Sequence, residues 1–158
     1  MEEIKSSENK KVKNATRVLY DNINFRSLFE KDCYVLLKQA GFNFEYETKR
    51  IVLLSGFYPP DFIKIYDLYK PRLKKRVFGI NKSKILDITY TPDFYLQKND
   101  VEIYIEAKGN PNDAYPIKKK MFLNYLRMQA EITGKTFMFF EPHSKKQMKD
   151  TIKIINDL

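Results

Sequence analysis

The sequence predicts an α/β domain in which short strands and helices share one core. Residues 90–109 alternate in the manner of a two-stranded hairpin, and residues 27–40, 116–132 and 144–158 place apolar side chains at helical spacing. Hydrophobic residues make up 43% of the 158-residue chain, which is enough for a single sizeable core. We therefore expect one folded domain rather than a disordered chain.

The first helix is expected at residues 27–40, and Gly41 supplies its stop signal. Ser27 and Glu30 have the S-x-x-E spacing of a capping box at its start. Two interpretations of Glu30 are open. Its side chain could simply bond back to the helix N-terminus, or it could present an acidic group to a site on the sheet that follows.

Two strands are expected next, one in the alternating residues 42–47 and one at residues 51–54. A longer insertion occupies about residues 48–87. It contains Pro59-Pro60, and Asp61 is expected to cap a short helix that Pro71 ends. The apolar positions of that helix would be Phe62, Ile65, Tyr66 and Tyr69.

The predicted hairpin at residues 90–109 places its ionisable side chains on one face. A four-residue loop at residues 97–100 would pair Leu96 with Val101 and set Asp93 opposite Tyr104. Glu106 is then the diagonal neighbour of Asp93. Pro92 lacks an N–H and predicts a bulge or a break in pairing beside Asp93.

Two carboxylates at diagonal positions are close enough to converge on one ion. Pro92-Asp93 and Glu106-Ala107-Lys108 reproduce the PD-(D/E)XK nuclease pattern. Its carboxylates are ligands for Mg²⁺ or Mn²⁺, and its lysine orients the attacking water or balances charge. The alternative is a surface hairpin whose Glu and Lys merely face solvent.

After Gly109 the sequence predicts a turn, a helix opened by Pro116, a buried strand at residues 136–140 and a closing amphipathic helix at residues 144–158. The stripe expected to pack on the sheet comprises Ile117, Met121, Tyr125 and Met128, widened by Phe122 and Leu126. Lys118, Lys119 and Lys120 fall in the first turns. A basic cluster there opposes the helix dipole, which makes sense if phosphate binds beside it.

The chain carries 29 Lys and Arg against 20 Asp and Glu, a formal charge of +9, which favours a polyanionic partner. Residues 70–84 hold seven basic side chains and no acid, so a loop or hairpin laid along DNA is one interpretation and a solvated loop the other. The residues assigned to DNA contact there are Arg72, Lys74, Lys75 and Arg76. Residues 1–17 are expected to form a flexible basic arm.

The remaining composition indicates a cytoplasmic protein that does not enter a membrane. Cys33 is the single cysteine and is expected in the core, which fits a reducing compartment. No apolar run approaches the length of a membrane span, and the N-terminus lacks the apolar segment of a signal peptide.

Four blocks in order resemble the phage endonuclease I family of Holliday-junction resolvases, within the PD-(D/E)XK nucleases. These blocks are Phe25-Arg26-Ser27 with Glu30, Phe44-Glu45-Tyr46-Glu47 after Gly41, Tyr90-Thr91-Pro92-Asp93-Phe94, and Glu106-Ala107-Lys108-Gly109. The resemblance covers residues 25–47 and 88–109, under half the chain. The insertion between Thr48 and Asp87 and the chain after Gly109 depart from it.

The resemblance implies a restriction-endonuclease-like core, with a mixed central sheet of about four to five strands flanked by helices, and often a homodimer. It implies that Glu30, Asp93 and Glu106 hold Mg²⁺ or Mn²⁺ and that Lys108 is the catalytic lysine. With it, the metal-site interpretation of Glu30 is preferred to the cap.

The expected function is a metal-dependent endonuclease acting on branched DNA such as Holliday junctions, in phage replication or recombination in a bacterial host. A nicking, restriction-like or end-trimming nuclease remains open on the same core. So does a non-catalytic basic DNA-binding module, whose acids would only solvate the hairpin.

Overall fold

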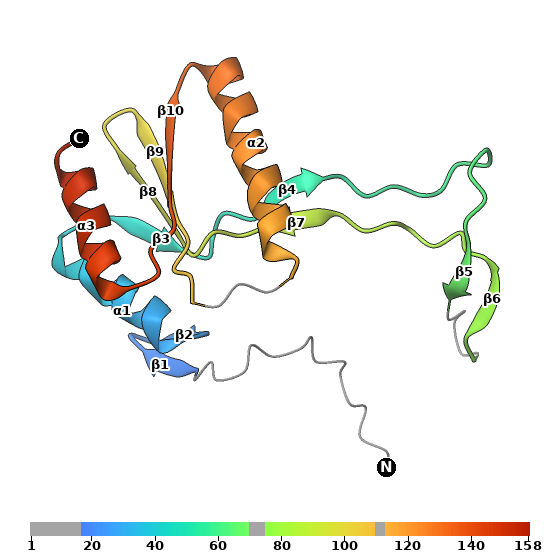
Figure 1. Cartoon of the computed structure of the whole chain (residues 1–158), viewed down its shortest axis with the longest axis horizontal. Helices are drawn as coiled ribbons and strands as arrows, with labels where there is room; N and C mark the ends of the chain where they lie inside the picture. The colour runs from blue at the N-terminus through green and yellow to red at the C-terminus, as the bar shows by residue number, and fades with distance from the viewer. Residues whose placement is uncertain (1–16, 70–74, 110–112) are drawn as a thin grey trace, which may run out of the picture. The chain divides into compact units, whose positions relative to one another are not determined.

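The computed structural model describes residues 17–69, 75–109 and 113–158, and the chain divides into two compact units (Figure 1). The first unit comprises Met1–Lys49 and Thr91–Leu158, and the second is Arg50–Tyr90. Apart from Arg17, the predicted N-terminal arm lies outside the described residues.

The first unit is built on a mixed four-stranded sheet. Its strands are β3 (Phe44–Tyr46), β8 (Phe94–Lys98), β9 (Val101–Ile105) and β10 (Thr136–Phe140), in the order β10-β9-β8-β3. β10 runs parallel to β9, and the other two pairs are antiparallel. The prediction of an α/β fold with a mixed sheet and flanking helices is confirmed at this level.

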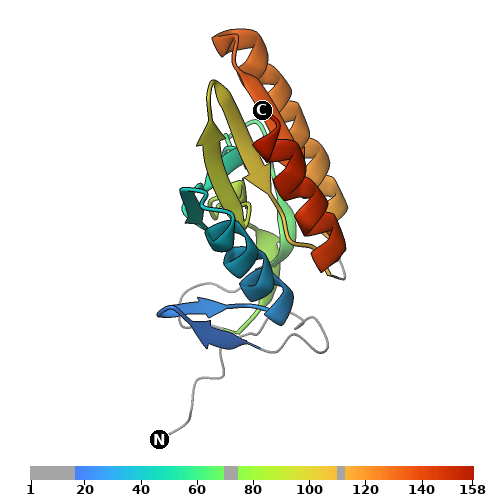
Figure 2. The ribbon, with the colours of Figure 1, turned by 90° about the vertical axis from the view of Figure 1, so that its left-hand side faces the viewer.

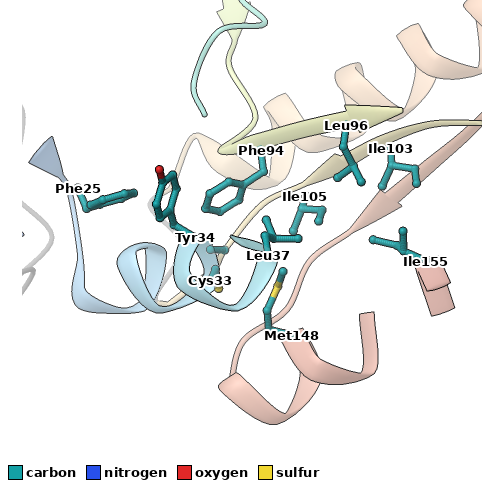
Figure 3. Close-up of a cluster of buried hydrophobic side chains, with 11 residues drawn as sticks. Phe25, Cys33, Tyr34, Leu37, Phe94, Leu96, Ile103, Ile105, Met148 and Ile155 are labelled. Atoms are coloured by element: carbon teal, nitrogen blue, oxygen red, sulfur yellow. The ribbon is translucent and has the colours of Figure 1, made fainter. Parts of the chain in front are cut away.

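Helices cover both faces of this sheet. α1 (Leu28–Gln39) and α3 (Lys145–Asn156) lie on one face, which is turned toward the viewer in Figure 2, and α2 (Tyr115–Thr133) lies on the other. The core between the sheet and helices α1 and α3 includes the side chains labelled in Figure 3: Phe25, Cys33, Tyr34, Leu37, Phe94, Leu96, Ile103, Ile105, Met148 and Ile155. The alternation in β8 and β9 therefore selects the core face as expected.

The opposite face of the β8–β9 hairpin is partly covered, because α2 packs against Tyr104 on it. The ring of Phe122 lies 5.3 Å from that of Tyr104 and 5.7 Å from that of Phe139, measured between centroids. The buried side chains of α2 are Tyr115, Phe122 and Leu126, whereas Ile117 and Met128 are 65% and 46% exposed. The prediction for α2 was thus wrong about which residues lie at the centre of its buried face. Phe122 and Leu126, predicted at the edge of the stripe, point toward the sheet, and Ile117 and Met128 do not.

The register of the hairpin differs from the prediction by two residues. Asn99 adopts a left-handed φ of 52°, which closes a two-residue turn and pairs Leu96 with Ile103 instead of Val101. A shift of two leaves every side chain on its predicted face. Continued one residue past the Phe94–Ile105 pair, this register sets Asp93 opposite Glu106 rather than diagonal to it.

The second unit consists of paired strands. β4 (Ile51–Leu54) pairs with β7 (Ile88–Tyr90), and β5 (Tyr66–Tyr69) pairs with β6 (Val77–Ile80), both antiparallel.

The prediction of a helix after Asp61 was wrong, since Tyr66–Tyr69 form the strand β5. Four aromatic or aliphatic positions span only two helical turns, and their composition suits a strand equally well. The distant partner strand Val77–Ile80 decides between them.

In the part of the chain that the structure describes, every helix is too short or too polar to cross a membrane.

Candidate active site

Asp93 and Glu106 lie side by side at one end of the sheet. Asp93 directly precedes β8 and Glu106 directly follows β9, and each is only 6% exposed. The chain after β9 continues to bond along β10, because the Glu106 N–H donates to the Phe140 carbonyl at 2.9 Å. The Ala107 N–H donates to Asp93 Oδ2 at 2.8 Å. The backbone thus fixes both carboxylates in a buried position.

The negative charge of Asp93 is disfavoured where it stands. Burial raises the pKa of the Asp93 carboxyl well above its ordinary value of 3.8, and the neighbouring charges of Glu106 and Glu30 raise it further. The hydrogen bond from the Ala107 N–H opposes them, and Glu47 adds a smaller repulsion. A cation placed among these groups would relieve the repulsion between their negative charges.

Lys108 is held beside this pair. Its Nζ lies 2.9 Å from Glu106 Oε1 and 3.6 Å from the centroid of the buried Tyr115 ring. The Tyr115 hydroxyl donates a hydrogen bond to Glu141 Oε2, and Lys119 forms an ion pair with the same carboxylate at 2.7 Å. α2 and the end of β10 therefore position the ring that supports the lysine.

Glu30 makes the capping contacts that one interpretation predicts. Its N–H donates to Ser27 Oγ at 3.1 Å, and its Oε2 accepts from the Arg26 N–H at 3.1 Å. The same Oε2 accepts from the Tyr46 hydroxyl at 3.0 Å, and the side chain is buried. Burial and the charge of Glu30 raise the pKa of Tyr46. The carboxylate therefore caps α1 while its charge acts on Asp93.

Glu47 is a fourth acidic residue at this site, and the sequence analysis did not assign it there. It follows β3 with a left-handed φ of 51°, a conformation that costs a non-glycine residue about 1 kcal/mol or more. Its N–H donates to the Asp93 carbonyl at 2.9 Å. Burial raises the pKa of Glu47, the Arg26 guanidinium lowers it, and Glu30 and Glu106 raise it again.

The contact between Arg26 and Glu47 is an ion pair more than a hydrogen bond. Arg26 Nη2 lies 2.7 Å from Glu47 Oε1, yet this buried oxygen accepts no well-aligned hydrogen bond among the described residues. Simple alternation along the F-E-Y-E block assigns Glu47 to the same outward face as Glu45. Alternation fails at Glu47 because β3 ends at Tyr46, so the pattern of the strand no longer applies to the next residue.

The donor set fits Mg²⁺ or Mn²⁺ in its chemistry, since Asp93, Glu106, Glu30 and Glu47 supply the hard carboxylate oxygens these ions prefer. Across residues 17–69, 75–109 and 113–158, however, no three acidic, histidine or cysteine side chains already converge as metal ligands. The contacts explain why: Glu30 bonds to Arg26 and Tyr46, and Glu106 bonds to Lys108.

The predicted DNA-binding residues fall in both units. Arg72 and Lys74 lie outside the described residues, and Lys75 and Arg76 are exposed just before β6. Lys118, Lys119 and Lys120 lie in the first turns of α2, which has no acidic residue in its first turn and no side-chain N-cap. Lys119 is engaged by Glu141, as described above.

A scan against models of protein families finds no match, and neither do searches of curated proteins and of solved structures. The function is therefore argued from the geometry of the site.

Proposed function

We propose that this protein is a metal-dependent endodeoxyribonuclease that hydrolyses phosphodiester bonds in branched DNA such as Holliday junctions. One observation supports the proposal above all others: Asp93 and Glu106 are buried side by side, with Lys108 Nζ 2.9 Å from Glu106. Buried like charges are costly, and a structural role would be filled more cheaply by neutral residues.

In this proposal Asp93 and Glu106 hold the divalent ion, and Glu30 and Glu47 stand next to them. The ion supplies Lewis-acid polarisation of the scissile phosphate when bound. Lys108 orients the water that attacks phosphorus and balances charge there. The bond between phosphorus and the 3′ oxygen breaks, the 3′ oxygen takes up a proton, and the products carry a 5′-phosphate and a 3′-hydroxyl.

The basic residues then serve to bind the phosphate backbone. Lys118, Lys119 and Lys120 follow Lys108 in the sequence and lie in the first turns of α2, and Lys75 and Arg76 lie on the second unit. The finer features of the proposal rest on the resemblance to the endonuclease I family: a restriction-endonuclease-like core, a preference for four-way junctions, a homodimer and action in the cytoplasm of a phage-infected bacterium.

A cleavage panel tests the proposal. The full chain is incubated with a four-way junction, a flap, a duplex and a single strand in Mg²⁺, in Mn²⁺ and in EDTA. We expect metal-dependent cleavage that is fastest on the junction. Cleavage that is metal-dependent but fastest on plain duplex would indicate a nicking or restriction-like nuclease instead.

The matched control is the Lys108→Ala protein, which keeps both carboxylates but loses the proposed catalytic ammonium. It should bind the junction and cleave it far more slowly. Binding without cleavage by the unmodified chain, in either metal, would leave a non-catalytic DNA-binding module.

A further inference from the structure

The hairpin β5–β6 of the second unit presents an apolar face to solvent. Its register pairs Tyr66 with Ile80 and Leu68 with Phe78, and alternation puts all four on the same face. Their exposed fractions are 58%, 40%, 59% and 74% in that order. An apolar face this exposed on a two-stranded hairpin indicates an interaction site.

Two aromatic rings stand at the centre of this face. Tyr66 and Phe78 are diagonal neighbours whose ring centroids lie 6.5 Å apart, with their planes inclined by 33°. Both rings are more than half exposed. Exposed aromatic rings on a strand surface are the usual platform on which unpaired bases stack, because every base has a π-face.

The charges around this face select the partner. Lys75 and Arg76 precede β6, Lys82 and Lys84 follow it, and all four are exposed. Within the described ranges none of the four forms an ion pair with an acid of this chain. The hairpin's acid, Asp67, points to the opposite face and accepts a hydrogen bond from Asn81 Nδ2 at 3.1 Å. A second copy of this face would bring like charges together, whereas a polyanion complements them.

We propose that this hairpin binds an unpaired stretch of DNA, with bases stacked on Tyr66 and Phe78 and phosphates bound by Lys75, Arg76, Lys82 and Lys84. The inference rests on the proposed function in taking DNA as the ligand. It adds that the substrate contains single-stranded nucleotides next to the branch.

Binding is measured by fluorescence anisotropy with a labelled oligothymidylate of about 16 nucleotides, the upper range for one such binding surface. A duplex of equal length is the comparison. The full chain carries Asp93→Asn to prevent cleavage. Replacing both rings, Tyr66→Leu with Phe78→Leu, keeps an apolar face and removes the π-faces. We expect affinity for the single strand to fall by about tenfold or more and affinity for the duplex to stay within about twofold. Equal affinity of the leucine variant and its parent for the single strand would overturn the inference.

A second readout does not depend on the folding of a variant. An oligonucleotide containing iododeoxyuridine cross-links under ultraviolet light to aromatic residues that stack on the modified base. Mass spectrometry should find the cross-link on the peptide of Tyr66 or Phe78. Cross-links confined to other peptides would contradict the proposal. Sedimentation of the free proteins gives a further check: a dimeric parent with a monomeric leucine variant would show that this face binds a second copy of the chain, which would also contradict the proposal.

The same experiments separate this inference from the nuclease proposal. Cleavage of junctions by the unmodified chain together with ring-independent binding rejects only the base-stacking hairpin. Ring-dependent binding of the single strand without cleavage in Mg²⁺ or Mn²⁺ rejects only the nuclease and leaves the inference standing.

Discussion

Helices α1 and α3 begin with the same capping arrangement. In each, an N-cap serine accepts a hydrogen bond from the N–H three residues later: Ser27 from Glu30 at 3.1 Å, and Ser144 from Gln147 at 3.2 Å. In each, that later side chain reaches back to a backbone N–H before the helix. Glu30 Oε2 accepts from Arg26, and Gln147 Oε1 accepts from His143 at 2.6 Å.

The two caps differ in charge and in burial. Gln147 is a neutral, exposed residue, whereas Glu30 is an acid that is 8% exposed and bonded to Tyr46. α3 therefore shows that a neutral side-chain oxygen is sufficient for this cap. The acid at Glu30 is not explained by capping, and burying it beside Asp93 is costly. We take the difference between the two helix ends as support for the proposed site.

The largest effect should come from the buried pair Asp93 and Glu106. Asp93→Asn or Glu106→Gln removes a proposed metal ligand, so we expect cleavage of the junction to fall by about a thousandfold or more. DNA binding in an anisotropy assay should remain within a few-fold. Loss of the fold in either variant, seen by circular dichroism, would show that these residues are structural. The acid at Glu30 would then not mark an active site.

Asp93→Asn should also stabilise the metal-free protein at neutral pH. The raised pKa of Asp93 means that the folded state binds this proton more tightly than the unfolded state, so stability falls as pH rises from about 3.8 through the raised value. Asparagine can still accept the Ala107 N–H and carries no charge. We expect a melting temperature a few degrees higher at pH 7, on the order of 1 kcal/mol, and little gain at pH 4. A lower melting temperature at pH 7 would contradict the charge argument.

Glu30→Gln converts the cap of α1 into the cap of α3. Because the amide oxygen can accept the same backbone bond, the melting temperature should change little. Removing the acid beside the proposed ion should slow cleavage at least about a hundredfold, roughly 2.7 kcal/mol of barrier. Gln147→Glu is the matched control and should leave cleavage unchanged. Near-normal cleavage by the Glu30→Gln protein would show that Glu30 only caps α1 and takes no part in the metal site.

Helix α2 offers a further contrast with α1 and α3. It begins without a capping side chain, and its Tyr115 ring lies under the Lys108 ammonium. Tyr115→Leu removes the ring under the ammonium and should slow cleavage about tenfold, the scale of one lost cation–π contact of about 1–2 kcal/mol. Tyr115→Phe keeps the ring and removes the hydroxyl that bonds to Glu141, so it should recover most of the rate. Equal rates for the leucine and phenylalanine proteins would show that the ring does not position Lys108.

Local patterns in the sequence predicted much of the first unit. Serine three residues before Glu30 predicted the start of α1, and Gly41, which has a φ of 77°, marked its end. Period-two alternation predicted the faces of β8 and β9 even though the turn was wrong. Asn99 in a left-handed turn shortened the loop from four residues to two, and an even shift does not change which face a side chain occupies.

Long-range pairing could not be predicted in the same way. Tyr66 was assigned to a helix because its partner Ile80 lies far along the chain, beyond the reach of a local pattern. The buried stripe of α2 depends on Tyr104 and Phe139, which belong to two different strands. Glu47 was missed because alternation assigns it to the face of Glu45. Its backbone turns only because β3 ends there, next to Asp93.

The smallest effects concern the serines that the two caps share. Ser27→Ala and Ser144→Ala each remove an acceptor for one N–H at a helix start, so each should cost about 1 kcal/mol, or about 2–4 °C in melting temperature. Ser27 Oγ also donates to Glu30 Oε1 at 3.2 Å, so its loss should be at least as costly as that of Ser144. Cleavage should stay within about threefold of normal in both, because Tyr46 and Arg26 still hold the Glu30 carboxylate. If Ser27→Ala slowed cleavage as much as Glu30→Gln does, the position of the carboxylate rather than its charge would be what the site requires, and the contrast with α3 would lose its meaning.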